Sequence, residues 1–327
     1  MIMALRLEWM FAATALAAVA LLACDAAPGA TNSSPARKRW FIGDLQHHED
    51  GSRPITEHVA IVKKAGYDFI CLQYKDMEDP KRVPDAKALS SDTFLVIPGA
   101  EQAFQGSRSL WNHMGFMPFG IPMPETITDY MNITQGIAEA ERRSPGCLKV
   151  IHHPGDGRWL LADVKTAYEG GTRFIELNRE ENPVQFAIDL WDQALSAGMF
   201  FYATISTDAH GLGGIRRRGY VRVRAARLTR KDILGALKAG DFLAEEEGFA
   251  AAVTDVVRPR GKAGQEYRVL GKDIAEVRFI GRAGKRLATV QGSNAAYTIA
   301  GNEGYVRAEA LDAAGLRCFT QPVMVSK

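Results

Sequence analysis

Short apolar segments alternate with longer amphipathic segments over the first three-quarters of the chain. The short segments are rich in β-branched and aromatic residues, which is typical of buried strands. They predict strands at residues 41–50, 67–72, 94–98, 148–151, 174–178 and 200–204, with a further apolar segment at 111–117. Apolar residues at helical spacing predict helices over 54–65, 125–143 and 184–197, and glycines at 66 and 198 end the first and the last of them.

This alternation predicts a parallel α/β architecture over residues 39–248, because strands separated by helices form parallel sheets. Polar residues that can bind metals or donate protons follow most of the predicted strands. Barrel-type enzymes carry their chemistry at that carboxyl end of the strands. The pattern therefore favours an enzyme with a site at one end of a barrel.

The pattern changes at residue 249. Short strand candidates follow one another without an intervening long helix, at residues 253–258, 267–269, 274–280, 287–291, 296–299, 305–311 and 319–325. Gly, Asp and Asn separate them, as in turns of antiparallel sheets. Residues 249–327 are therefore predicted to form a small C-terminal antiparallel β-sandwich-like domain.

The N-terminus resembles a bacterial lipoprotein signal. Arg6 precedes an apolar run over 9–23, which is followed directly by Cys24. The resemblance implies a signal peptide over 1–23, a lipid on Cys24 that holds the protein on a membrane, and a tether over 24–38. The expected location is the bacterial cell envelope, periplasmic or otherwise extracytoplasmic. An ordinary secretory signal and an uncleaved anchor are the alternatives.

Composition excludes some classes of protein. Of the 327 residues, 46% are hydrophobic and 24% are charged, which is ordinary for a globular protein. A formal net charge of +2 gives no reason to expect a nucleic-acid partner. Beyond Cys24, the three remaining cysteines are widely spread, so they indicate neither a disulfide framework nor a zinc knuckle.

A set of polar residues at strand ends is the candidate site. In the first strand, Gln46 and His48 point to one face and His47 to the other, because side chains alternate along a strand. Imidazoles and carboxylates that converge from several strand ends suit a divalent zinc, manganese or iron ion. The candidates are Gln46, His48, Lys75, Glu101, His113, His153, Asp208 and His210.

The order of these motifs resembles the polymerase-and-histidinol-phosphatase (PHP) superfamily. The motifs are Gly-Asp-Leu-x-x-His, Gly-Tyr-Asp-Phe-Ile, Ile-Pro-Gly-Ala-Glu, a lone His, Ile-His-His-Pro and Ser-Thr-Asp-Ala-His. The end of the chain reads Tyr-Val-Arg-Ala-Glu-Ala-Leu-Asp at 305–312 and Phe-Thr-Gln-Pro-Val-Met-Val at 319–325, and it resembles the carbaryl-hydrolase-like branch of that superfamily. The resemblance implies a distorted (βα)7 barrel with up to three metals, which hydrolyses small-molecule phosphoesters or other esters with a metal-activated water.

The resemblance also implies a role for each residue. The first metal would be bound by Gln46, His48, Glu101 and Asp208. Glu101 would bridge to a second metal bound by His113 and His153, and a third would share His210. Two positions depart from the family pattern: Gln46 replaces a histidine, and Lys75 stands where the third metal needs a histidine. We therefore expect one or two ions, with Glu101, His210 and Lys75 as catalytic residues and the Lys75 ammonium in place of the third ion.

The sequence leaves several alternatives open. Because two ligand positions have changed, a catalytically inactive lipoprotein that acts as a binding or scaffold protein is the second hypothesis. The arginines at 216–218 either attract an anionic substrate or lie in a solvated loop. Glu176 and Asn178 either support the metal ligands or cap a strand. The resemblance favours His153 over His152, because the histidine of the family pattern directly precedes a proline. The oligomeric state is open.

Overall fold

The computed structural model describes residues 37–49, 51–74, 85–108, 111–119, 131–156, 158–177, 184–215 and 218–326. Residues from Arg37 to the C-terminus form one compact unit. The predicted signal peptide, Cys24, Lys75 and Asn178 lie outside the described residues, so the predictions about them stay predictions. Within the described ranges, no helix combines the length and the apolar composition needed to cross a bilayer.

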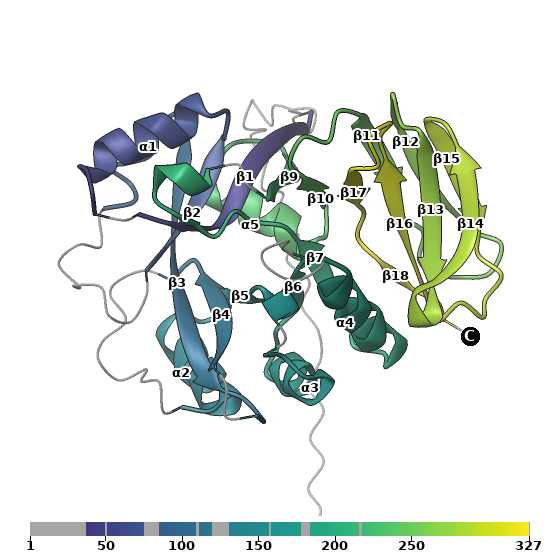
Figure 1. Ribbon diagram of the computed structural model, residues 1–327, viewed down its shortest axis with the longest axis horizontal. Helices are drawn as coiled ribbons and strands as arrows, with labels where there is room; N and C mark the ends of the chain where they lie inside the picture. The colour runs from purple at the N-terminus through teal and green to yellow at the C-terminus, as the bar shows by residue number, and fades with distance from the viewer. Residues whose placement is uncertain are drawn as a thin grey trace, which may run out of the picture. The chain divides into compact units, whose positions relative to one another are not determined.

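A large mixed sheet organises the chain (Figure 1). Its strands run in the order β10-β9-β1-β2-β3-β4-β5-β6-β7, and the short β8 pairs with β1. The bounds are β1 Arg39–His48, β2 Phe69–Tyr74, β3 Leu95–Gln105, β4 Trp111–Met117, β5 Leu148–Ile151, β6 Phe174–Glu176, β7 Tyr202–Thr204, β8 Ala209–His210, β9 Gly219–Ala225 and β10 Phe242–Glu246.

The predicted parallel α/β architecture is present only in part. β1, β2 and β3 are parallel, as are β5, β6 and β7, but β4 pairs antiparallel with both β3 and β5. A short connection from β3 to β4 makes a hairpin, whereas a parallel pair needs a crossover of a dozen or more residues. The strands are therefore a mixed α/β sheet, and the (βα)7 barrel stays a prediction.

Five α-helices are present in the described residues. They are α1 Ile55–Lys64, α2 Ile133–Arg143, α3 Leu161–Glu169, α4 Val184–Ser196 and α5 Arg230–Lys238. The helix predicted over 125–143 begins at Ile133, because the side chain of Asn132 accepts a hydrogen bond from the Gln135 backbone N–H and caps it. Helices α3 and α5 were not predicted.

The C-terminal strands are all paired antiparallel, as predicted. Strands β14-β13-β16-β17 continue the large sheet through β10, and β11-β12-β15 form a separate sheet. Buried side chains of both sheets, including Val253, Tyr267 and Phe279, share one apolar cluster. Because β17 pairs with β10, the boundary at 249 and the sandwich-like class stay predictions. The bounds are β11 Ala252–Val257, β12 Glu266–Lys272, β13 Glu276–Gly281, β14 Lys285–Gln291, β15 Asn294–Thr298, β16 Tyr305–Leu311, β17 Arg317–Phe319 and β18 Val323–Met324.

Candidate metal centre

Glu101 lies at the centre of the candidate site, on β3, and is 2% exposed. Its Oε1 atom is 3.1 Å from His113 Nδ1 and 3.1 Å from His153 Nε2. Gln46 Nε2 donates to the same oxygen at 2.9 Å. The antiparallel β4 brings His113 beside β3, and His153 follows the end of β5. Three predicted strand ends therefore meet at one carboxylate.

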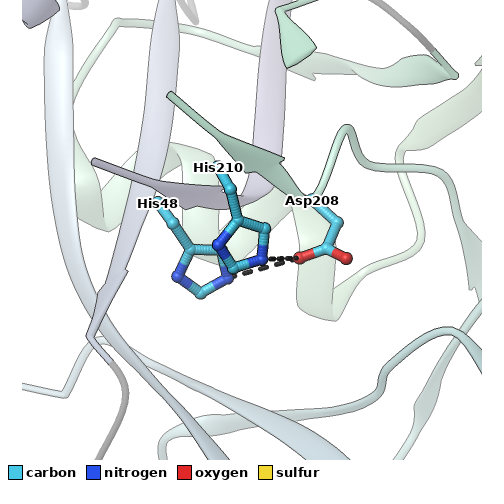
Figure 2. A group of neighbouring side chains, drawn as sticks. All are labelled: His48, Asp208 and His210. Carbon is cyan, nitrogen blue, oxygen red and sulfur yellow. Dashed lines mark ion pairs between the residues drawn. The ribbon is translucent and has the colours of Figure 1, made fainter. Parts of the chain in front are cut away.

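A second group contains His48, Asp208 and His210. Figure 2 shows the two imidazole rings stacked beside each other, with the Asp208 carboxylate facing both. The Oδ1 atom of Asp208 is 3.4 Å from His48 Nε2 and 3.4 Å from His210 Nε2. This arrangement follows from the pairing of β8 with β1, which places His210 opposite His48.

The two groups are joined through Glu101. His48 Nε2 is 3.3 Å from Glu101 Oε2, while Oε1 faces the other group. Within each group the ligand atoms lie within 4.8 Å of one another. Ligands bound to one ion at about 2.1 Å in tetrahedral geometry are separated by about 3.4 Å. The nitrogen and oxygen atoms are therefore spaced as ligands of divalent ions, with one carboxylate oxygen directed to each group.

The electrostatics of the site favour cations. Burial raises the pKa of Glu101, but hydrogen bonds from His113, His153 and His48 lower it well below its ordinary value. Burial also lowers the pKa of His48, yet its contacts with Asp208 and Glu101 raise it to about 9. Two ionised carboxylates therefore hold a proton on an imidazole, and a metal ion would bind that imidazole only after displacing the proton.

Two candidate ligands have left-handed backbone conformations. The φ angles are 26° at His153 and 46° at Asp208. Such values are uncommon outside glycine, and they persist only where surrounding contacts hold them. The His153 N–H donates to Glu176 Oε2 at 2.8 Å, and the Asp208 N–H donates to Gln46 O at 3.0 Å. The chain therefore maintains backbone strain at two of its candidate ligands.

Glu176 supports the site from behind. Besides the His153 N–H, it accepts a hydrogen bond from Ser206 Oγ, and its Oε1 is 3.2 Å from His152 Nδ1. His152 Nε2 in turn is 3.0 Å from Gln73 Oε1. His153 therefore contacts Glu101 directly, whereas His152 contacts Glu176 and Gln73. Of the two alternatives for Glu176, support of a ligand or capping of a strand, its contacts favour support of a ligand.

We expect Glu176→Ala to weaken metal binding by about 10- to 100-fold, the usual effect of removing a group that orients a ligand. The reason is the loss of the acceptor that holds the His153 backbone. Zinc affinity measured against a competing chelator checks this. Glu303→Ala is the matched control, because Glu303 also accepts backbone N–H bonds but at residues 300–302, among the C-terminal strands. Equal zinc affinities in wild type and Glu176→Ala would contradict the role of Glu176.

Two polar side chains near the site received no definite role from the sequence. Arg218 is buried, and its Nη1 lies 3.3 Å from Asp208 Oδ2. A solvated loop, one of the two alternatives for residues 216–218, is therefore wrong for Arg218, and residues 216 and 217 lie outside the described residues. Asp44 accepts from the Thr207 N–H at 3.0 Å and contacts His47 Nδ1 at 2.9 Å. No local sequence pattern indicates the burial of Arg218; it follows from the position of Arg218 directly before β9, the strand that pairs with β1.

Comparisons with known proteins identify no family. No family model matches the chain, and no curated protein matches it. A two-domain protein from Bacteroides vulgatus that contains a predicted PHP-like metal-dependent phosphoesterase is 17% identical, with a TM-score of 0.48 over 86% of this chain and 87% of that one. An amidohydrolase from Chromobacterium violaceum is 14% identical, with a TM-score of 0.41 over 53% of this chain and 89% of that one. Likenesses this distant assign neither a family nor an activity, so the site's own geometry must carry the function.

Proposed function

We propose that this chain is a metal-dependent hydrolase of the PHP type that acts on phosphoesters or other esters of small molecules. The observation that supports it best is the position of Glu101, whose two carboxylate oxygens face two separate groups of imidazoles. A carboxylate in that position bridges two ions in many hydrolytic centres. The buried Gln46 Oε1, which has no hydrogen-bond partner among the described residues, offers a further neutral oxygen.

Two groups of residues would hold the two ions. His48, Asp208 and His210 would hold one ion, and Glu101 would bridge to a second beside His113 and His153. When bound, such ions supply an activated water and neutralise charge that develops on the ester. Gln46 donates to Glu101 and keeps its carboxylate oriented.

Charged and accessible side chains complete the proposed chemistry. Arg218 balances the charge of Asp208. His210 has the most exposed side chain of the three in its group, at 53%. With its Nε2 as a ligand, its Nδ1–H is the proposed hydrogen-bond donor to the oxyanion that develops on the ester. Lys75 remains the proposed substitute for a third ion.

We further propose that the protein is exported and anchored by a lipid on Cys24. The support is the sequence of residues 1–24 alone. Cys24→Ala would then move the protein from the membrane fraction to the soluble fraction of the cell envelope. Retention of that variant in the membrane would favour an uncleaved anchor.

Metal analysis combined with turnover tests the hydrolase. We expect one or two bound zinc, manganese or iron ions per chain and metal-dependent turnover of a generic aryl phosphodiester or aryl ester. Three tightly bound ions would contradict the role given to Lys75. Bound metal without turnover of any ester would favour the alternative of a catalytically inactive binding or scaffold lipoprotein.

Gln46→His is expected to tighten binding of the ion at His48 by about tenfold, or about 1.4 kcal/mol. An imidazole is a stronger ligand for zinc than a neutral amide oxygen, and Gln46 is already directed at Glu101. Zinc titration of both proteins measures the change. The control is Gln102→His. Gln102 is buried and directly follows Glu101 on β3, so its side chain points to the opposite face of the strand. Equal tightening in both variants would contradict the assignment.

A further inference from the structure

A cavity lies at the N-terminal ends of β5, β6 and β7. Its volume is about 440 Å³, within the range of small-molecule sites. Leu148, Phe174 and Tyr202, the first residues of β5, β6 and β7, line it. His153 of the metal centre follows the other end of β5, so that strand separates the cavity from the metal centre.

One side of this cavity is aromatic and preorganised. The rings of Phe200 and Tyr202 meet edge to face at a centroid distance of 4.7 Å, and Tyr202 also packs against Phe174 at 5.5 Å. Phe174 is buried, whereas Phe200 and Tyr202 are only partly buried. A flat apolar ligand could therefore stack here without displacing a side chain.

The rest of the lining carries an excess of positive charge. The lining contains three cations and one carboxylate; the cations are Lys149, Arg173 and Lys238, and the carboxylate is that of Glu141. Glu141 is paired with Lys149, whose Nζ lies 2.5 Å from Glu141 Oε2. Lys149 is itself 7% exposed, so the pair is part of the cavity wall.

The other two cations, Arg173 and Lys238, donate hydrogen bonds to backbone oxygens, and the Arg173 guanidinium also lies over the Tyr168 ring, 4.0 Å from its centroid. Arg173 donates to Tyr168 O and Thr172 O, each at 2.7 Å, and Lys238 Nζ donates to Gly146 O at 2.9 Å. In the part of the chain that the structure describes, neither forms an ion pair with a carboxylate. Each therefore keeps a charge that an anion could neutralise.

We propose that this cavity binds a small aromatic anion, with the ring against Phe200 and Tyr202 and the anionic group between Arg173 and Lys238. The excess of positive charge favours a ligand with an anionic group, and the aromatic side chains favour a ligand with a ring. The site is separate from the metal centre, and the proposal does not depend on the hydrolase activity.

Calorimetric titration of the full-length protein with naphthalene-2-sulfonate tests this, because a sulfonate is a poor ligand for zinc, manganese and iron ions. We expect saturable binding that the double variant Arg173→Gln/Lys238→Gln weakens at least about tenfold. Phe200→Ala, which removes only the stacking ring, should weaken it about fivefold. Circular dichroism establishes that each variant is folded. The control Lys272→Gln/Lys285→Gln removes two exposed charges from β12 and β14 and should bind as wild type does.

Further measurements separate this cavity from the metal centre. Glu101→Gln should bind the sulfonate with unchanged affinity, and inorganic sulfate or neutral 2-naphthalenemethanol should bind at least about tenfold more weakly. Unchanged binding in the Arg173/Lys238 variant, loss of binding in Glu101→Gln, or equal affinity for inorganic sulfate would each overturn the proposal.

Discussion

Glu101→Gln is expected to lower metal-dependent ester hydrolysis by about 1,000-fold, equivalent to about 4 kcal/mol of transition-state stabilisation. The substitution keeps the shape of the side chain and an oxygen that can accept from Gln46 Nε2. It removes the negative charge that His113, His153 and His48 all contact. Initial rates with added manganese or zinc, together with metal content, measure the effect.

Glu266→Gln is the matched control for this experiment. Glu266 lies at the start of β12 and pairs with the exposed Arg268, so the same chemical change occurs away from the site. We expect wild-type rates and metal content from it. Wild-type turnover by Glu101→Gln, with thermal unfolding showing both variants folded, would refute the proposed metal centre.

Local periodicity accounts for much of the site. Because side chains alternate along a strand, Gln46 and His48 were predicted to share a face, and both contact Glu101. His47 was predicted to face the other way, and its Nε2 meets His58 Nε2 at 2.8 Å. The spacing of residues within one strand therefore indicated which side chains face the site.

Long-range pairing accounts for what local sequence pattern alone does not show; His113 was grouped with Glu101 through the resemblance to the PHP superfamily and not through its spacing. His113 reaches Glu101 because β4 reverses direction beside β3, and an apolar segment has the same pattern whichever way it runs. Arg218 is buried because it precedes β9, which pairs with both β1 and β10. Neither fact depends on the residues next to the side chain in sequence, so neither could be predicted from local pattern.

Strand β16 is a second case in which local sequence pattern does not predict burial. Tyr305, Arg307 and Glu309 alternate with small apolar residues, which is the pattern of a strand with one solvated face. In the structure every residue of β16 is buried. The polar face is covered because Asp192 of α4 contacts it: Arg307 donates to both Asp192 carboxylate oxygens at 2.8 Å, and Tyr305 Oη donates to Asp192 Oδ1 at 2.7 Å.

This contact leads to the largest stability effect that we expect. Arg307→Met should lower the free energy of unfolding by about 3–5 kcal/mol, the cost of removing one partner from a buried ion pair. Arg307 is 1% exposed and also donates to Glu309 Oε1 at 2.6 Å. Burial lowers the pKa of Arg307, but Glu309 and Asp192 outweigh that effect and raise it above its ordinary value. The variant would therefore leave two buried carboxylates without their cation.

Urea unfolding followed by tryptophan fluorescence measures the loss, and Arg278→Met is its matched control. Arg278 also contacts a glutamate two residues away in its own strand, with Nε 2.5 Å from Glu276 Oε1, but its side chain is 30% exposed. A partly exposed pair contributes at most about 1 kcal/mol. Similar losses in the two variants would mean that burial does not strengthen the Arg307 contacts.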